Sequence, residues 1–253
     1  MIRLETKWNY TELAESYLKR PDYSPSAIQS LLKIVSKNDS LTACDIGAGV
    51  AHLTLELAPF CEEVCAVEPN FEMRKLGVER TKTFKNVKWF DGTGESTGQQ
   101  ATKFDFCTFG SSFNVCDRDK ALREAKRILK PDGWFSCLWN HRDLTDPIQA
   151  EIETIIKSNI DSFGYGDRRE DQTDIINASG LFGDVIRLQG DVVYDLEANE
   201  VITAWRSHAS LQRQAGDKFE KIISEISRFL EKSQLKIVKT PYTTRIWVAK
   251  VRG

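Results

Sequence analysis

The segment Asp45-Ile46-Gly47-Ala48-Gly49 places an acid and two glycines at the end of an apolar run, where they could form a ligand-binding turn. Glycines in such a turn let the backbone approach a ligand closely. A second acid, Glu68, ends the next apolar run and is followed by Pro69. In open α/β sheets, an acid about 20 residues after the turn accepts hydrogen bonds from the ribose hydroxyls of a nucleotide. The spacing therefore predicts a nucleoside site.

The kind of nucleoside is indicated by what the turn lacks. A dinucleotide-binding turn needs a small third residue in the pattern G-x-G-x-x-G/A, but counting from Gly47 that position is His52. No Gly-Lys-Ser/Thr follows, so a phosphate-binding P-loop is excluded. The pattern favours a nucleoside without phosphates, S-adenosylmethionine. An NAD-linked dehydrogenase is the disfavoured alternative.

Composition limits the classes of protein that the chain can represent. Its 253 residues are 41% hydrophobic and 28% charged, as expected for one α/β domain or a domain with a lid. A net charge of −2 indicates no general attraction to nucleic acid or membranes. The sequence shows neither a signal segment nor an apolar run near the roughly 18 residues of a membrane span, and we expect a cytoplasmic protein. The six cysteines lack metal-ligand spacing, so we expect no metal.

The elements that must position the turn alternate between strands and helices, as in a parallel sheet with helices on both faces. Apolar runs predict five strands, over residues 41–46, 64–67, 87–90, 104–109 and 133–139. Ser24 and Asp117 stand before two helical stripes as N-caps. Beyond Asn140 the sequence predicts two more strands, over 183–193 and 242–251, and helices over 197–213 and 219–230.

These elements divide the chain into four parts. Residues 1–40 would form an N-terminal helical cap and residues 41–145 the cofactor-binding core. Residues 146–182 would form a helical insertion that could fold over the site. Residues 183–253 would complete the core with strands six and seven and add further lid helices.

Several motifs resemble those of the class I S-adenosylmethionine-dependent methyltransferases, particularly the small-molecule branch of trans-aconitate-type and natural-product methyltransferases. Residues 10–140 carry most of the resemblance. The motifs are Asp45–Gly49, Glu68-Pro69, Gly92-Thr93-Gly94-Glu95, Ala121–Gly133, Leu138–Asp143 and Tyr17-x-x-Arg20-Pro21-x-Tyr23. The resemblance implies an α/β fold, namely a Rossmann-like, doubly wound sheet of seven strands with the last strand antiparallel, together with helical N-terminal and inserted lid segments.

The resemblance also implies S-adenosylmethionine as cofactor, S-adenosylhomocysteine as product, and a set of residues that hold them. Glu68 matches the ribose-binding acid, the Gly92–Glu95 segment lies beside the adenine, and Tyr17 and Arg20 lie over the methionine end. The full cofactor set is Tyr17, Arg20, Asp45, Gly47, Ala48, Gly49, Glu68, Pro69, Gly92, Thr93, Gly94, Glu95 and Ser111.

Two departures from the family and one histidine bear on the chemistry. Thr93 replaces the frequent Asp that pairs with the adenine amino group, and Asn114 replaces a frequent His, so a titrating base is absent there. Asn114 can still orient a polar acceptor. His141 follows Trp139 and Asn140 at the carboxyl end of a strand, where ligands of open α/β sheets bind. We expect His141 and Asn114 to take part in catalysis.

Aromatic and basic residues are expected around the acceptor. The predicted set is Tyr10, Phe113, Trp139, Asn140, Arg142, Tyr165, Trp205 and Arg206. Arginine side chains can hold a carboxylate or phosphate in a bidentate manner, and the candidates for this role are Arg142, Arg168, Arg169 and Arg206. This cluster suggests a small anionic acceptor.

The function that these observations favour is methyl transfer to an oxygen or nitrogen of a small molecule. In-line displacement at a sulfonium is driven mainly by proximity and desolvation. We expect a monomer or homodimer that binds neither nucleic acid nor membrane. The alternatives are an RNA or protein methyltransferase and a catalytically silent relative that binds the cofactor.

Overall fold

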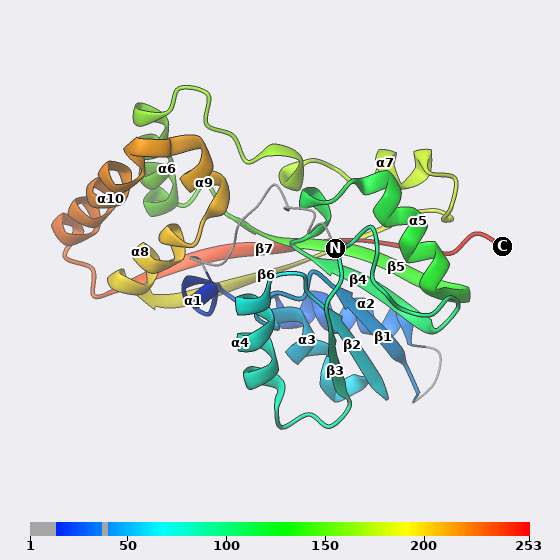
Figure 1. Cartoon of the computed structure of the whole chain (residues 1–253). Helices are drawn as coiled ribbons and strands as arrows, with labels where there is room; N and C mark the ends of the chain where they lie inside the picture. The colour runs from blue at the N-terminus through cyan, green and yellow to red at the C-terminus, as the bar shows by residue number, and fades with distance from the viewer. Residues whose placement is uncertain (1–13, 37–39) are drawn as a thin grey trace.

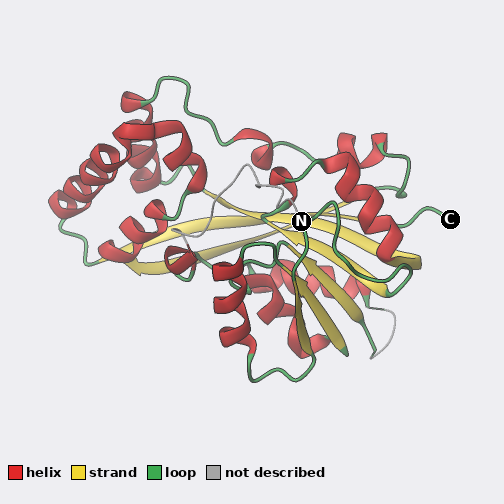
Figure 2. Ribbon diagram, viewed as in Figure 1, coloured by secondary structure: helices red, strands yellow, loops and turns green. Residues whose placement is uncertain are grey.

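A sheet of seven strands runs through the protein, whose computed structural model describes residues 14–36 and 40–253 (Figures 1 and 2). The order across the sheet is β3-β2-β1-β4-β5-β7-β6. The strands are β1 Thr42–Ile46, β2 Glu63–Val67, β3 Val87–Phe90, β4 Phe104–Gly110, β5 Leu129–Arg142, β6 Ile186–Glu197 and β7 Ile237–Lys250. The first five are parallel, whereas β7 runs antiparallel to both β5 and β6. The predicted Rossmann-like sheet with an antiparallel last strand is confirmed.

The strand order reverses at β1, and this reversal fixes where a ligand can bind. The chain moves outward from β1 to β2 and β3, and then returns to the other side of β1 for β4 and β5. Connections on the two sides therefore diverge at the carboxyl ends of β1 and β4. In open α/β sheets, the crevice at such a switch point is the ligand site.

Helices cover both faces of the sheet. α2 (Pro25–Val35) and α3 (His52–Leu57) pack on one face, and α5 (Arg118–Ile128) and α7 (Thr173–Ala178) pack on the other. α4 (Phe71–Thr81) follows β2 and contacts β3. Among residues 14–36 and 40–253, no helix is both long and apolar enough to cross a membrane.

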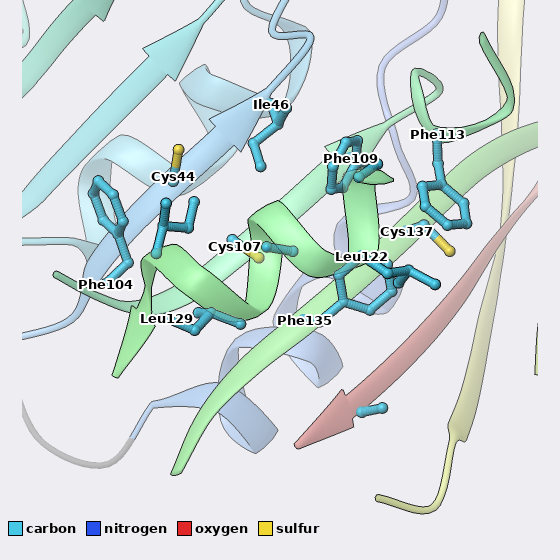
Figure 3. Close-up of a cluster of buried hydrophobic side chains, with 14 of the residues drawn as sticks. Cys44, Ile46, Phe104, Cys107, Phe109, Phe113, Leu122, Leu129, Phe135 and Cys137 are labelled. Atoms are coloured by element: carbon cyan, nitrogen blue, oxygen red, sulfur yellow. The ribbon is translucent and has the colours of Figure 1, made fainter. Parts of the chain in front are cut away.

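The core beneath α5 is aromatic (Figure 3). Phe109 of β4, Phe135 of β5 and Phe113 after β4 are fully buried, and their ring centroids lie between 5.4 and 5.9 Å apart. On β4, Phe109 faces this cluster while Phe106 packs against α2 on the opposite face. Burial on both faces explains why apolar residues of β4 point to both sides of the sheet.

A second group of helices packs at one end of the molecule, where β6 and β7 extend into it (Figure 1). This four-helix cluster consists of α6 (Pro147–Asn159), α8 (Ala198–Arg206), α9 (Ala209–Ala215) and α10 (Phe219–Ser233). Its interior contains Ile152, Trp205 and Ile222, each almost fully buried. Short elements complete the described chain: α1 (Ala14–Tyr17) and the 3₁₀ turns Ala58–Phe60, Phe113–Val115, Gly166–Arg169 and Gly216–Lys218.

The structure departs from the sequence-based elements at identifiable places. The helix predicted over 197–213 is two helices, α8 and α9, because the His208 side chain accepts the Leu211 N–H and begins a new helix. Ser24 occupies the N-cap position of α2, but its hydroxyl contacts the Asp191 carbonyl oxygen and the Ser26 hydroxyl and accepts no backbone N–H of the helix. The Asp117 cap of α5 is confirmed, since its carboxylate accepts the Lys120 N–H.

Phe135→Ala should lower the free energy of unfolding by about 3–5 kcal/mol, because it removes a fully buried ring and leaves a cavity. Urea unfolding followed by circular dichroism measures this loss. Phe60→Ala is the matched control, because Phe60 is 57% exposed and should lose less than about 1 kcal/mol. Equal losses in the two variants would contradict the assignment of Phe135 to the core.

Candidate functional site

A cavity of about 570 Å³ opens at the carboxyl ends of the central strands, at the switch point. One wall is formed by the turn after β1 and by Glu68 at the end of β2. The opposite wall comes from the end of β5, from the Gly166–Arg169 turn, and from α8 and α9 of the four-helix cluster. Its volume lies within the range of small-molecule sites.

Glycine is required at the first position of the turn. Gly47 has φ +70°, and a Cβ built on it would lie 2.4 Å from the Cβ of Ser112. Ser112 is fixed there because its Oγ donates to the Ile46 carbonyl oxygen at 2.6 Å. The N–H groups of Gly47 and Ala48 both donate to the Val67 carbonyl oxygen, at 2.8 and 3.1 Å. The turn is therefore tied to both neighbouring strands.

The Glu68 carboxylate is held by backbone donors at the cavity wall. Its Oε2 accepts the Gly49 N–H at 2.9 Å, and its Oε1 accepts the Asn70 N–H at 2.8 Å. The side chain is almost fully buried. Desolvation raises the pKa of Glu68, and the two hydrogen bonds oppose this shift only in part. Each carboxylate oxygen retains a second lone pair, so Glu68 can still accept from a diol.

Asp45 lies beneath the turn and carries a polar atom without a partner. Its Oδ2 accepts the Thr54 hydroxyl at 2.6 Å, while Oδ1 is buried and has no hydrogen-bond partner among the residues described. Burial raises the pKa of Asp45 to about 7. A buried acceptor of this kind on a cavity wall suits a ligand that brings a donor or a positive charge.

The loop after β3 forms a third part of the wall. Thr93 and Ser96 exchange two backbone hydrogen bonds, which brings Thr93, Gly94 and Glu95 to the cavity. A Cβ on Gly94 would lie 2.5 Å from the Cys116 sulfur. Gly92, predicted to contact the cofactor, does not line the cavity, since the space around its α-carbon is filled by Thr97 and Val67.

The remaining residues predicted for the cofactor do reach the cavity. The structure places all of the following on its wall: Tyr17, Arg20, Asp45, Gly47, Ala48, Gly49, Glu68, Pro69, Thr93, Gly94, Glu95 and Ser111. The Arg20 guanidinium lies 3.7 Å from the centre of the Tyr17 ring and donates to the Ser207 carbonyl oxygen. This contact connects the N-terminal segment to the four-helix cluster across the cavity.

The two residues predicted for catalysis have different surroundings. Asn114 lines the cavity, and its side-chain oxygen accepts the Trp139 indole N–H at 3.0 Å. His141 does not line the cavity: its Nε2 donates to the Arg168 carbonyl oxygen at 2.8 Å. Burial lowers the pKa of His141 to about 4. It is a neutral group that holds the Gly166–Arg169 turn, and the expectation that it contacts the acceptor is corrected.

Four of the residues predicted for the acceptor also lie away from the cavity. Phe113 is part of the aromatic core because its ring turns under α5. Trp205 is buried in the four-helix cluster. Tyr165 donates its hydroxyl to Glu153, and Arg206 is an exposed residue of α8 that pairs with Glu220 at 2.8 Å.

Three other residues predicted for the acceptor do reach the cavity. Trp139 and Arg142 lie on the cavity wall. Asn140 reaches it too, but its side chain is already bonded to the Pro21 and Asp22 carbonyl oxygens and to the Thr244 hydroxyl. Asn140 therefore anchors the N-terminal segment to the sheet. Tyr10 lies outside the described residues.

Some wall residues were absent from the predicted site. Tyr23 donates to or accepts from Ser111 at 3.1 Å, and burial raises its pKa, so its hydroxyl stays neutral. His208 and Tyr242 also line the cavity, as does Arg168, which was a candidate for an anion. The sequence signal for Tyr23 was its place in the Tyr17–Tyr23 motif. No local pattern marks His208 or Tyr242.

Comparisons with known proteins agree with this site. Residues 44–137 match the model of the "Methyltransferase domain" family. The chain is 33% identical over 138 residues to the uncharacterized methyltransferase C25B8.09 of Schizosaccharomyces pombe, which covers 54% of each protein. It is 30% identical over 112 residues to a demethylmenaquinone methyltransferase of Staphylococcus carnosus, covering 43% of this chain and 46% of that protein. The chain thus spans about half the length of the curated relatives it matches.

A solved structure extends the likeness of the fold beyond the matched domain. The crystal structure of YcgJ from Bacillus subtilis superposes with a TM-score of 0.58 at 18% identity, covering 90% of this chain and 99% of that one. The matched domain spans the glycine turn, Glu68 and the loop after β3. Residues 44–137 therefore match a methyltransferase domain, and the motif residues of this segment surround the cavity. Beyond it, the chain shares the fold of YcgJ.

Proposed function

We propose that this protein transfers a methyl group from S-adenosylmethionine to an oxygen or nitrogen of a small-molecule acceptor. The observation that carries the proposal is the pairing of Glu68 with the Gly47–Gly49 turn on one cavity wall. That wall supplies a carboxylate for a ribose diol and a backbone that a side chain cannot obstruct.

The residues present fit the cofactor in two further respects. The cofactor carries a positively charged amino group, and the buried Oδ1 of Asp45 is an acceptor to which no described residue donates. The cofactor also carries a carboxylate, and the Arg20 guanidinium lies on the cavity wall beside Tyr17. Thr93, Gly94 and Glu95 offer backbone and side-chain groups to the adenine.

The bound cofactor would supply a methyl group already activated on a sulfonium. The contribution of the protein is then to bind both reactants, align them and exclude water. Asn114 and Trp139 form a fixed polar pair on the wall beyond the turn, where they can orient an acceptor. Proximity can lower the activation barrier by up to roughly 7–11 kcal/mol. A general base accelerates a reaction about 10²–10⁴-fold, which corresponds to about 3–5 kcal/mol. Alignment of the reactants can therefore outweigh proton removal by a general base.

The size of the cavity supports a small acceptor. About 570 Å³ must hold both the cofactor and the acceptor, whereas pockets for a single drug-sized ligand measure roughly 300–1,000 Å³. A net charge of −2 also offers no broad basic surface for RNA. A cytoplasmic location and a monomeric or homodimeric state remain predictions.

Glu68→Gln should weaken the binding of S-adenosylhomocysteine by about 10–100-fold. The new amide places an N–H₂ against the N–H of either Gly49 or Asn70, which both donate to the carboxylate, and it removes an acceptor for the ribose. Isothermal titration calorimetry measures the affinity. The control is Glu79→Gln, the same change at an exposed residue of α4. If Glu68→Gln binds within twofold of the control, the ribose assignment is wrong.

Asp45→Asn should raise the melting temperature of the ligand-free protein at about pH 8, by roughly 5 °C. The pKa of Asp45 is raised from 3.8 to about 7 in the folded state. The folded protein therefore loses stability as the pH rises through this interval, and the loss is complete above it. The variant has no carboxyl to ionise, so its advantage should shrink to nothing near pH 4. A pH-independent difference in melting temperature would contradict the assignment.

Incubation with a labelled methyl donor and a fractionated metabolite extract should yield S-adenosylhomocysteine and a labelled small molecule. Mass spectrometry identifies both products. Label that enters only RNA or protein fractions would instead support a macromolecular acceptor. Cofactor binding without turnover in every fraction would make the protein a silent relative, and either result would overturn the proposed function.

A further inference from the structure

One region of the cavity contains hydrogen-bond donors that find no acceptor within residues 14–36 and 40–253. It is formed by Arg142 at the end of β5, Arg168 in the Gly166–Arg169 turn and His208 at the start of α9, and we call these three residues the donor cluster. The tertiary structure brings them together from three segments of the chain.

The tautomer of His208 is set by its capping role. Its Nδ1 accepts the Leu211 N–H at 3.1 Å. Because Leu211 is fully buried, water cannot replace Nδ1 as the acceptor of this N–H. Burial and three nearby arginines hold the pKa of His208 well below its ordinary value, so the ring is neutral. A neutral imidazole that accepts at Nδ1 carries its hydrogen at Nε2.

The Nε2–H of His208 therefore faces another donor. The Arg168 Nη2 lies 3.1 Å from it, and arginine has no acceptor atom. The Arg168 Nε is also buried without a hydrogen-bond partner among the described residues. An anion oxygen beside the pair, within hydrogen-bond distance of both nitrogens, would accept from both and remove the conflict.

Arg142 adds a second positive charge with a fixed orientation. Its guanidinium carbon lies 4.0 Å from the centre of the Trp205 ring and 5.5 Å from that of Tyr242. Stacking holds the plane of the group and leaves its N–H edge for a ligand. Within the described chain, neither Arg142 nor Arg168 forms an ion pair with a carboxylate.

The surroundings of Arg168 show the same lack of negative charge. Burial, followed by repulsion from Arg20 and Arg142, lowers its pKa to about 10, so it keeps its charge at neutral pH. The nearest acid along the chain, Asp167, is bonded to Arg118 at 2.6 Å. Buried like charges are costly unless a counter-charge joins them.

We propose that the donor cluster is an oxyanion site that binds a carboxylate or phosphate of the methyl acceptor. The inference rests on the proposed function and specifies the acceptor as a small anionic molecule. Arg168 and His208 would both donate to the same oxygen of the anion, and Arg142 would donate to a second oxygen. The aromatic faces of Trp139 and Tyr242 would border the rest of the molecule.

The test titrates protein saturated with S-adenosylhomocysteine with inorganic phosphate or succinate, at constant ionic strength. At least one of the two anions should bind saturably. Its affinity should fall by about tenfold or more in Arg142→Gln and in Arg168→Gln. The control is Arg228→Gln, which changes an exposed arginine of α10 and should leave anion binding within twofold. Preference for phosphate or for succinate distinguishes a phosphorylated acceptor from a carboxylic acid.

Three results would overturn the proposal. Neither anion binds, anion binding is unchanged in both cluster variants, or the variants weaken S-adenosylhomocysteine instead, which would assign the arginines to the cofactor. If the wild-type protein binds the anions but not S-adenosylhomocysteine, the proposed function fails and the anion site remains. Where Arg168→Gln does not fold, Arg142→Gln and Arg168→Lys decide, because lysine keeps the charge but lacks the planar fork.

The tautomer of His208 gives an independent readout. The chain has three histidines, so ¹⁵N–¹H correlation spectra of the imidazole rings can be assigned with His208→Gln. The spectra should show hydrogen at Nε2 and a shift of that resonance when phosphate is added. Hydrogen at Nδ1 would make Nε2 an acceptor for Arg168. The two donors would then be paired with each other, and the proposed anion site would be contradicted.

Discussion

The hydrogen bond between the Glu68 carboxylate and the Gly49 N–H is the contact on which the site depends. It joins the end of β2 to the turn that leaves β1, and the Val67 carbonyl oxygen accepts two N–H groups of the same turn. The turn cannot collapse onto the strand because Ser112 fills the space beside Gly47. These contacts fix a concave backbone surface at the switch point of the sheet before any ligand arrives. Such preorganisation reduces the ordering cost of binding.

The cavity has two chemically different walls. The wall from β1, β2 and the loop after β3 carries acids, among them Asp45 and Glu68, whereas the wall from the end of β5 and from α9 carries donors. A charged cofactor and an acceptor of opposite local charge could therefore be sorted to the two sides by electrostatics alone. Among the described residues, neither Asp45 nor Glu68 forms an ion pair with Arg142 or Arg168.

The N-terminal segment that lines the cavity is hydrogen-bonded to three distant parts of the chain. Both ring nitrogens of His52 face oxygens of this segment, on Asp22 and Tyr17. Asn140 binds the Pro21 and Asp22 carbonyl oxygens from β5, and Arg20 reaches Ser207 between α8 and α9. These hydrogen bonds add to a small apolar cluster, in which Ala14 and Leu18 of the same segment pack with Met73 of α4.

The sequence alone determined the features that depend on local chemistry. The parallel strands, the Asp117 cap and the glycine turn with Glu68 follow from short-range rules: alternation of apolar runs, side-chain capping and the steric freedom of glycine. Only the tertiary structure decided which side chains reach the cavity. Phe113 and Trp205 lie in the core because burying their rings is more favourable than exposing them at a cavity wall. Arg206 pairs with Glu220 of α10 on the surface. The meeting of Arg142, Arg168 and His208 depends on long-range packing of β5, the Gly166–Arg169 turn and α9, which no local pattern encodes.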